Sequence, residues 1–121
     1  MSLLAMPKRP AVQGVYYMPS YMYDDTDLVD HPLLVVGSDQ VTRHAFVATR
    51  TTKPHAKGPK GVPHPAGLIR ELDLPGWWRL HRLHDVPWQH FNEPETKFLG
   101  RLDDDTWTRV QATLNGKEET R

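Results

Sequence analysis

Short apolar runs separated by turn-forming residues fill the first half of the chain. Residues 14–18 (GVYYM) are β-branched and aromatic, and residues 31–37 (HPLLVVG) pass from His-Pro into an apolar run of strand length. Residues 44–52 (HAFVATRTT) are rich in β-branched side chains, which favour the centre of a sheet. These runs predict three strands, separated by a loop over 19–30 and a turn over 38–42.

Proline and glycine punctuate the middle of the chain. Residues 53–65 hold four Pro, two Gly, three Lys and two His. Because Pro fixes φ and removes a backbone donor, they predict a long basic loop. Residues 66–72 predict a strand, 73–76 a turn and 77–86 another strand. A helix also fits this last segment, limited to about ten residues by the flanking Gly and Pro.

If residues 77–86 form a strand, alternation sorts their side chains onto two faces. One face carries Trp78, Leu80, Arg82 and His84, and the other carries Arg79, His81 and Leu83. Since adjacent strand residues point in opposite directions, one of the two neighbouring tryptophans is expected in the core and the other at the surface.

The C-terminal pattern is helical. Asp103 can cap a helix whose first turn holds two further carboxylates, which the positive end of a helix favours. Helical spacing defines one apolar face, made of Leu102, Trp107, Val110 and Leu114. Gly116 stands where many helices end in a left-handed residue.

These elements predict a mainly β (α+β) fold. About five strands joined by Pro-rich loops, followed by one helix, favour a small antiparallel barrel. The length of 121 residues fits one domain. We place this domain at residues 14–116, after a flexible leader over 1–13 and before a frayed tail over 117–121.

Composition narrows the chemistry. The absence of Cys excludes disulfides, thiolate zinc sites and cysteine nucleophiles. Apolar residues make up 38% and charged residues 25%, values typical of a soluble folded chain. No apolar run approaches the roughly 20 residues of a membrane span, and no signal peptide is evident at the start. These features are consistent with a cytosolic protein.

The zero net charge hides an asymmetry. Residues 1–40 carry a net charge of −3, residues 41–90 of +5 and residues 91–121 of −2, when Lys and Arg are counted against Asp and Glu. The middle block also holds six of the seven His. Uneven surface charge is one interpretation, and a local anion-binding site is the other.

The order of these segments resembles the MazF/PemK/Kid family of toxin endoribonucleases, whose small SH3-like barrel is shared with CcdB. Residues 14–18 resemble the family's first strand, and residues 31–37 its second, which usually begins Arg-Pro. Residues 45–52 (AFVATRTT) resemble the third strand, which ends in a Thr-rich tip, and 51–58 (TTKPHAKG) the loop that follows it in some members. Residues 98–114 (FLGRLDDDTWTRVQATL) resemble the closing strand and helix, so the match spans nearly the whole chain.

The resemblance implies a cytoplasmic toxin of a type II toxin–antitoxin system. Members of the family are metal-independent endoribonucleases that cut single-stranded RNA by attack of a 2′-hydroxyl on the adjacent phosphate. They form homodimers, and an antitoxin with an extended acidic tail occupies their RNA groove. We therefore expect single-stranded RNA, an antitoxin and a second copy of the chain as partners, and neither a cofactor nor a membrane.

Carried across, the family's catalytic pair falls on His31 and Thr51. His31 replaces the usual Arg. An imidazole, which titrates near about pH 6.5, serves as an acid or base better than a guanidinium, but it supplies positive charge less reliably. Residues 77–86 resemble the family strand that carries a Gln, and Arg82 stands at that position, where it could replace the missing guanidinium. We predict His31, Thr51 and Arg82 as the catalytic residues.

Further side chains around these residues are candidates for holding RNA. Lysine and arginine neutralise phosphates, and aromatic rings stack on bases. The candidates are Arg50, Thr52, Lys53, Lys57, Lys60, Trp78 and His84. Alternation aims Arg50 away from Thr51.

Two other functions stay open. The His in place of Arg, together with the acidic loop holding Asp24, Asp25, Asp27 and Asp30, favours a non-catalytic barrel that binds a protein or nucleic-acid partner. A metal-dependent enzyme is suggested by three side chains that could act as metal ligands, His81, His84 and Asp85. Residues three apart on a strand face opposite ways, however, and zinc sites need three or four ligands in a fixed geometry.

Overall fold

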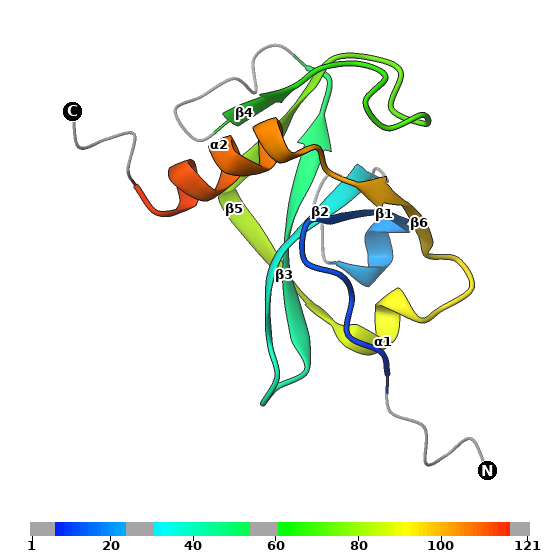
Figure 1. The fold of residues 1–121 in the computed structure, drawn as a ribbon. Coiled ribbons are helices and arrows are strands. Elements are labelled where there is room, and N and C mark those ends of the chain that lie inside the picture. Colours follow the sequence, from blue (N-terminus) through cyan, green and yellow to red (C-terminus); the bar gives the residue numbers. More distant parts are fainter. Residues whose placement is uncertain (1–6, 24–30, 54–60, 117–121) are drawn as a thin grey trace.

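A curled antiparallel sheet forms the body of the molecule (Figure 1). The computed structural model describes residues 7–23, 31–53 and 61–116. Its six strands run in the order β4-β5-β3-β2-β1-β6. They are β1 (Gly14–Met18), β2 (His31–Asp39), β3 (His44–Thr51), β4 (Gly61–His64), β5 (Gly76–Pro87) and β6 (Lys97–Arg101). The helices are the 3-10 helix η2 (Ser20–Met22), α1 (Trp88–Phe91) and α2 (Asp104–Leu114).

The predicted mainly β fold with a C-terminal helix is confirmed. Helix α2 packs against β4 and β5, and Figure 1 shows it lying across one end of the sheet. Helix α1 continues directly from β5 at the opposite end. The long central strands β2, β3 and β5 connect these two ends.

Alternation along the strands divides the core into two clusters, one on each side of the sheet. One cluster is built of Val15, Leu34, Ala48, Val62, Ile69, Leu72, Trp78, Leu80, Leu102 and Val110. The other is built of Met18, Met22, Tyr23, Leu33, Val35, Ala45, Val47, Val86 and Trp88. Consecutive residues such as Leu33 and Leu34 belong to different clusters, so the apolar run of β2 is apolar because both of its faces are buried.

Two predictions in the Pro-rich middle are wrong. Residues 61–64, expected in a loop, form the edge strand β4, in which Val62 and His64 are buried while Pro63 is exposed. An edge strand tolerates proline because its outer side needs no ladder donor. Residues 66–72, expected as a strand, form turns. Gly67 has φ +84°, and the turn still delivers Ile69 and Leu72 to the core.

Hydrogen bonds fix both ends of the domain. Asp103 caps α2 as predicted, because its carboxylate accepts from the backbone N–H of Thr106 at 2.9 Å. Gly116, at φ +70°, follows that helix as the pattern indicated. Gln13, expected in a loose leader, is only 5% exposed, and its side-chain amide donates to the carbonyl oxygen of Leu102 at 2.7 Å.

Candidate functional site

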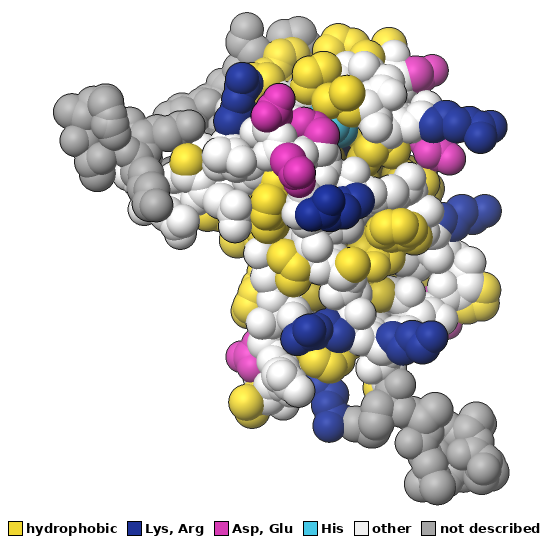
Figure 2. Space-filling view, viewed as in Figure 1, with side chains coloured by type: hydrophobic (Ala, Val, Ile, Leu, Met, Phe, Trp, Pro, Cys, Tyr) yellow, Lys and Arg dark blue, Asp and Glu magenta, His cyan; other side chains and the backbone are white. Residues whose placement is uncertain are grey.

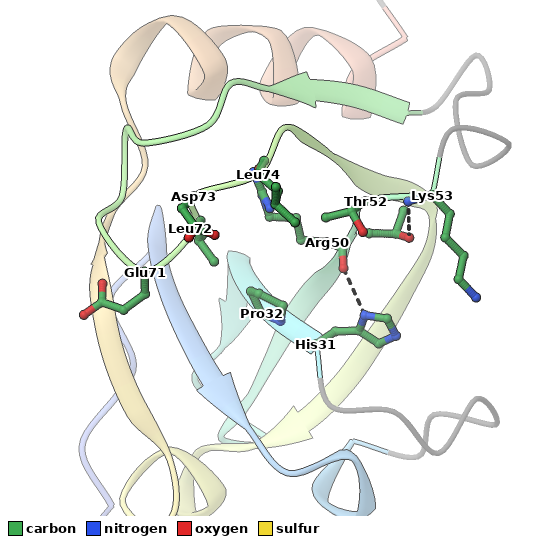
Figure 3. Close-up of a pocket in the computed structure, with 10 residues that line it drawn as sticks. His31, Pro32, Arg50, Thr52, Lys53, Glu71, Leu72, Asp73 and Leu74 are labelled. Atoms are coloured by element: carbon green, nitrogen blue, oxygen red, sulfur yellow. Dashed lines mark hydrogen bonds between the residues drawn. The ribbon is translucent and has the colours of Figure 1, made fainter.

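A pocket of about 330 Å³ opens where β2 begins and β3 ends. Its lining comes from three segments: the start of β2, the end of β3 with the two residues after it, and the connection from β4 to β5. The lining residues are His31, Pro32, Arg50, Thr51, Thr52, Lys53, Glu71, Leu72, Asp73 and Leu74. Figure 3 shows His31 and Lys53 on one side, with Glu71, Leu72 and Asp73 on the other.

The fold brings the predicted pair His31 and Thr51 to this pocket. Leu33 stands opposite Thr49 in the antiparallel register of β2 and β3. Two residues further along, the same register sets His31 beside Thr51, and directly opposed residues share a face of the sheet. The contact that closes this end of the ladder joins His31 Nδ1 to the backbone carbonyl oxygen of Arg50 at 3.0 Å.

That contact assigns the tautomer of His31. A backbone carbonyl only accepts, so Nδ1 carries the proton of the neutral ring and Nε2 carries the lone pair. The backbone N–H of His31 donates to the Tyr23 hydroxyl at 2.9 Å, which fixes the strand at this residue. Nε2 is enclosed by the surrounding atoms, although the residue as a whole is half-buried. The arrangement suits a general base whose substrate must displace a neighbour to reach it.

The hydroxyl oxygen of Thr51 accepts one hydrogen bond within the protein. Its Oγ1 accepts from the backbone N–H of Lys53 at 3.2 Å, which turns the chain at the end of β3. An acceptor contact leaves the hydroxyl proton available for donation to a phosphate oxygen. The residue is 6% exposed, so its access to the pocket is narrow.

Arg50 points into the protein. It stands opposite Trp78 in the ladder, on the face of the sheet that carries the core cluster of Trp78. This face is opposite to that of Thr51, as alternation predicted. The guanidinium donates through Nε to His64 Nδ1 at 2.9 Å, and through Nη2 to the carbonyl oxygens of His64 at 3.2 Å and Leu74 at 2.8 Å. The residue is 4% exposed, and burial lowers the pKa of its guanidinium. Although Arg50 is among the residues that line the pocket, its Nε and Nη2 are bonded to the protein, so its prediction as an RNA contact gains no structural support.

His64 is the neutral partner of this buried cation. Burial lowers the pKa of His64 to about 4; the nearby Arg50 guanidinium acts in the same direction, and Asp103 opposes both. Its Nε2 lies 3.6 Å from Asp103 Oδ1. The sequence placed this histidine in a basic Pro-rich loop, where it could contact phosphates, and gave no indication of its burial.

Arg82 does not belong to the pocket. The step from Thr49 to Val47 on β3 covers two residues, while the matching step on β5, from Arg79 to His84, covers five. The three extra residues form an irregularity, and an odd number reverses the alternation beyond it. Arg82 is exposed within this irregular segment and has no partner in the register of β3 and β5; neither Arg82 nor Arg79 is among the residues that line the pocket. The prediction of Arg82 as the replacement guanidinium lacks structural support.

Arg79 is the guanidinium that the sheet places on the same face as His31. It stands opposite Thr49 in the ladder, and its Nε donates to Thr49 Oγ1 at 2.8 Å. Thr49 is one register step from Thr51 on that face, a distance that long side chains cover. Regular alternation assigned Arg79 and His84 to opposite faces of this strand. The irregularity between them places both side chains on the same face.

One of the two neighbouring tryptophans is buried and the other is partly exposed, as expected, but the buried one is Trp78, which was predicted to contact RNA. Trp78 is fully buried, and its ring packs against the His64 ring with 5.5 Å between centroids. Its prediction as a base-stacking residue is therefore wrong. Trp77 is half-buried and stands directly opposite Thr51. It is the tryptophan that shares a sheet face with His31 and Thr51.

The other candidates for RNA contact fall into three groups. Thr52 and Lys53 are exposed and line the pocket. Lys57 and Lys60 lie outside the described residues. His84 is half-buried opposite Val47, with its ring edge against Tyr23 at 5.6 Å between centroids, away from the pocket lining.

The charge of the pocket is mixed. Lys53 lies on its rim, while Glu71 and Asp73 are exposed on the facing wall. On the face drawn in Figure 2, acidic side chains gather over the start of α2, whose first turn holds Asp104 and Asp105, and Lys and Arg side chains are spread over the rest. On that face the Lys and Arg side chains of the described residues stand in separate places and form no continuous basic track.

In residues 7–23, 31–53 and 61–116, no three His, Asp or Glu side chains gather in a way that could hold a metal ion. None of the helices in the same segments has the length and apolar character that a membrane span needs.

Comparison with solved structures identifies the class of fold. MazF from Deinococcus radiodurans superimposes with a TM-score of 0.66 at 14% identity, covering 93% of this chain and 99% of that one. A chain of the MazE–MazF complex from the same organism gives 0.63 at 17% identity, covering 94% and 99%. An endoribonuclease in complex with its cognate antitoxin, from a mycobacterial species, gives 0.62 at 17% identity, covering 93% and 97%.

The chain thus has the fold of the MazF toxins over nearly its whole length. No protein-family model and no curated protein matches its sequence. At this level of identity the likeness establishes architecture, and activity has to be argued from the side chains of the site.

Proposed function

We propose that this chain is the toxin of a type II toxin–antitoxin system, an endoribonuclease that cuts single-stranded RNA without a metal ion or cofactor. The observation that carries the proposal is the pairing of His31 with the end of β3, where an imidazole with a defined tautomer and a threonine hydroxyl line one pocket in a MazF-like fold.

The reaction is a transesterification. His31 Nε2 takes the proton of a ribose 2′-hydroxyl, and the oxygen attacks the adjacent phosphorus. The bond from phosphorus to the 5′-oxygen breaks, that oxygen leaves with a proton taken from water, and a 2′,3′-cyclic phosphate remains. Thr51 donates its hydroxyl proton to a phosphate oxygen, and Arg79 stabilises the charge that accumulates there. Arg79 takes the part first assigned to Arg82 because it stands one register step from Thr51.

Trp77 is the candidate platform for a base next to the scissile phosphate. It faces Thr51 across the ladder and retains exposed surface. Base–aromatic stacking typically contributes about 1–3 kcal/mol per base. Lys53 and Thr52, at the rim, would hold a flanking phosphate.

The partners proposed are an antitoxin with an acidic extended tail and a second copy of the chain, both in the cytoplasm. The similarity to a chain of a MazE–MazF complex and to an endoribonuclease bound to its cognate antitoxin supports the antitoxin. The pocket volume of about 330 Å³ favours a short, extended strand over a duplex as substrate.

A non-catalytic barrel that binds a protein or nucleic-acid partner is the second candidate. The enclosed His31 Nε2, the 6% exposure of Thr51 and the carboxylates of Glu71 and Asp73 favour it. Such a protein would bind its partner through the same rim without cutting it.

The test is incubation of the purified chain with a mixed RNA pool in EDTA. We expect cleavage that persists in the chelator and is lost in His31→Ala. His44→Ala is the matched control, since His44 is another histidine bonded through Nδ1, to Asp85 at 2.5 Å, and lies outside the pocket. RNA that stays intact at high protein concentration, with binding retained, would favour the non-catalytic barrel.

A further inference from the structure

A buried polar cluster lies behind the pocket, on the core side of β3. It joins Arg50, His64 and Asp103, which come from three separate elements: β3, β4 and the cap of α2. The side chain of His64 is 0% exposed. Burying a charge such as the Arg50 guanidinium costs free energy of folding unless the charge is paired and hydrogen-bonded.

The hydrogen bonds of the cluster define the state of His64. Arg50 Nε donates to His64 Nδ1, so Nδ1 carries a lone pair and Nε2 carries the proton. Nε2 faces Asp103 Oδ1 across 3.6 Å, which is too long for a hydrogen bond. Within the described segments, neither His64 Nε2 nor Asp103 Oδ1 has a hydrogen-bond partner. The other oxygen of Asp103 accepts from both the backbone N–H and the hydroxyl of Thr106.

The cluster is connected to the pocket through one residue. Arg50 presents its guanidinium to His64 and its backbone carbonyl to His31, so the same residue serves both sides of the strand. Three hydrogen bonds hold the guanidinium, two of them to His64. A side chain held at three points restricts the peptide from which it extends, and that peptide carries the carbonyl that orients the His31 ring.

We propose that His64 is a positioning residue for His31. By accepting from Arg50, it fixes the end of β3 and thereby holds His31 in the tautomer with a proton on Nδ1 and a lone pair on Nε2. This role of His64 rests on the proposed function, because there the lone pair on His31 Nε2 is the base for RNA cleavage. The coupling between the two histidines is a property of the fold and can be measured without RNA.

The experiment is nitrogen NMR of the full chain labelled in histidine, followed by single-turnover cleavage. His64→Leu removes the acceptor at similar volume, whereas His64→Asn keeps an acceptor near the position of Nδ1. Val110→Ala, a change in the same core cluster that touches neither histidine's hydrogen bonds, is the control for lost stability. Arg50→Lys is the second variant if His64→Leu does not fold, because an ammonium cannot reproduce the fork that reaches both His64 and Leu74.

In the wild type and in Val110→Ala we expect His31 to show a protonated Nδ1 and an unprotonated Nε2. His64→Leu should give a mixture of tautomers, and His64→Asn should restore the wild-type pattern. The cleavage rate of His64→Leu should fall about ten- to hundredfold at unchanged RNA affinity, as for other residues that orient a reacting imidazole. An unaltered His31 spectrum in His64→Leu or Arg50→Lys would overturn the proposal. A normal spectrum in a wild type that fails to cut RNA would remove the proposed function instead.

Discussion

His31 and Arg50 are joined across β2 and β3 by a 3.0 Å contact between an imidazole nitrogen and a backbone carbonyl oxygen. The contact has a chemical consequence, because it commits the proton of the neutral ring to Nδ1 and turns the lone pair of Nε2 away from the strand. An arginine at this position could not act in this way, since it stays protonated. Residues 31–37 resemble a family strand that usually begins Arg-Pro, so under the proposed function His31 supplies a base where that Arg would supply a fixed charge. The proposal therefore assigns the positive charge to another strand.

Arg79 and Arg82 form a matched pair for testing where that charge comes from. Arg79→Ala should lower kcat/KM for RNA about a hundredfold, because it removes the guanidinium one register step from Thr51. Arg82→Ala should change it less than about twofold, since Arg82 is exposed and, unlike Arg79, has no partner in the register of β3 and β5. Single-turnover kinetics on one synthetic RNA measures both. The reverse order of effects would show that the strand is in the regular register that alternation alone gives.

Trp77 and Trp78 test the separation of core from surface. Trp78→Ala should cost about 3–5 kcal/mol of unfolding free energy, because the side chain is fully buried. Trp77→Ala should cost much less stability but weaken RNA binding by about 1–3 kcal/mol if its ring stacks on a base. Urea unfolding and fluorescence titration with a short RNA measure the two quantities. Unchanged RNA affinity in Trp77→Ala would remove this side chain from the interface.

Gly76 allows a test of the space around Arg50. A Cβ at Gly76 would lie 2.8 Å from both Arg50 Cζ and the carbonyl oxygen of Thr51. Because the latter belongs to the backbone and cannot move freely, Gly76→Ala should destabilise the fold by about 1–3 kcal/mol. Gly37→Ala is the control, since its Cβ would have its nearest neighbour at 3.9 Å. Equal midpoints of urea unfolding for the two variants would contradict the packing described.

His64 makes stability depend on pH in a specific window. The unfolded chain binds a proton at this histidine near about pH 6.5, whereas in the fold burial lowers the pKa to about 4. Its contribution is therefore fully present above the unfolded value and is lost as the pH falls toward the folded one. A shift of this size corresponds to roughly 3 kcal/mol.

The comparison with His64→Asn isolates this contribution, because Asn does not titrate. Between pH 7 and pH 4 the wild type should lose roughly 3 kcal/mol more unfolding free energy than the variant, measured by urea unfolding at each pH. Parallel loss in both proteins would mean that His64 accepts a proton in the fold as readily as in the unfolded chain.

The sequence predicts the parts of this fold whose signals are local. Strand β1 follows from its β-branched and aromatic residues, and helix α2 follows from its apolar periodicity. The cap at Asp103 follows from its carboxylate ahead of the helix. Helix α2 and the strands β1, β2 and β3 also carry the resemblance to MazF, which the solved structures confirm at the level of fold.

The site was only half predictable for a physical reason. His31 and Thr51 were predicted through the resemblance to the MazF/PemK/Kid family, and both line the pocket at the ends of their strands. The choice of Arg79 over Arg82 depends on three extra residues in β5, and this irregularity is set by pairing with β3, which lies about 30 residues away. Burial of His64 likewise depends on the edge strand β4, which forms in spite of Pro63.

The most direct measurement of the central claim uses one RNA in two forms, with the purified chain in EDTA. The first is an all-ribose strand cut by the protein, and the second carries a single 2′-deoxy nucleotide on the 5′ side of the scissile phosphate. We expect cleavage of the first, with a 2′,3′-cyclic phosphate and a 5′-hydroxyl at the new ends, and no cleavage of the second at that site. Cleavage of the 2′-deoxy strand at the same position, or new ends that carry a 5′-phosphate, would contradict the role assigned to His31.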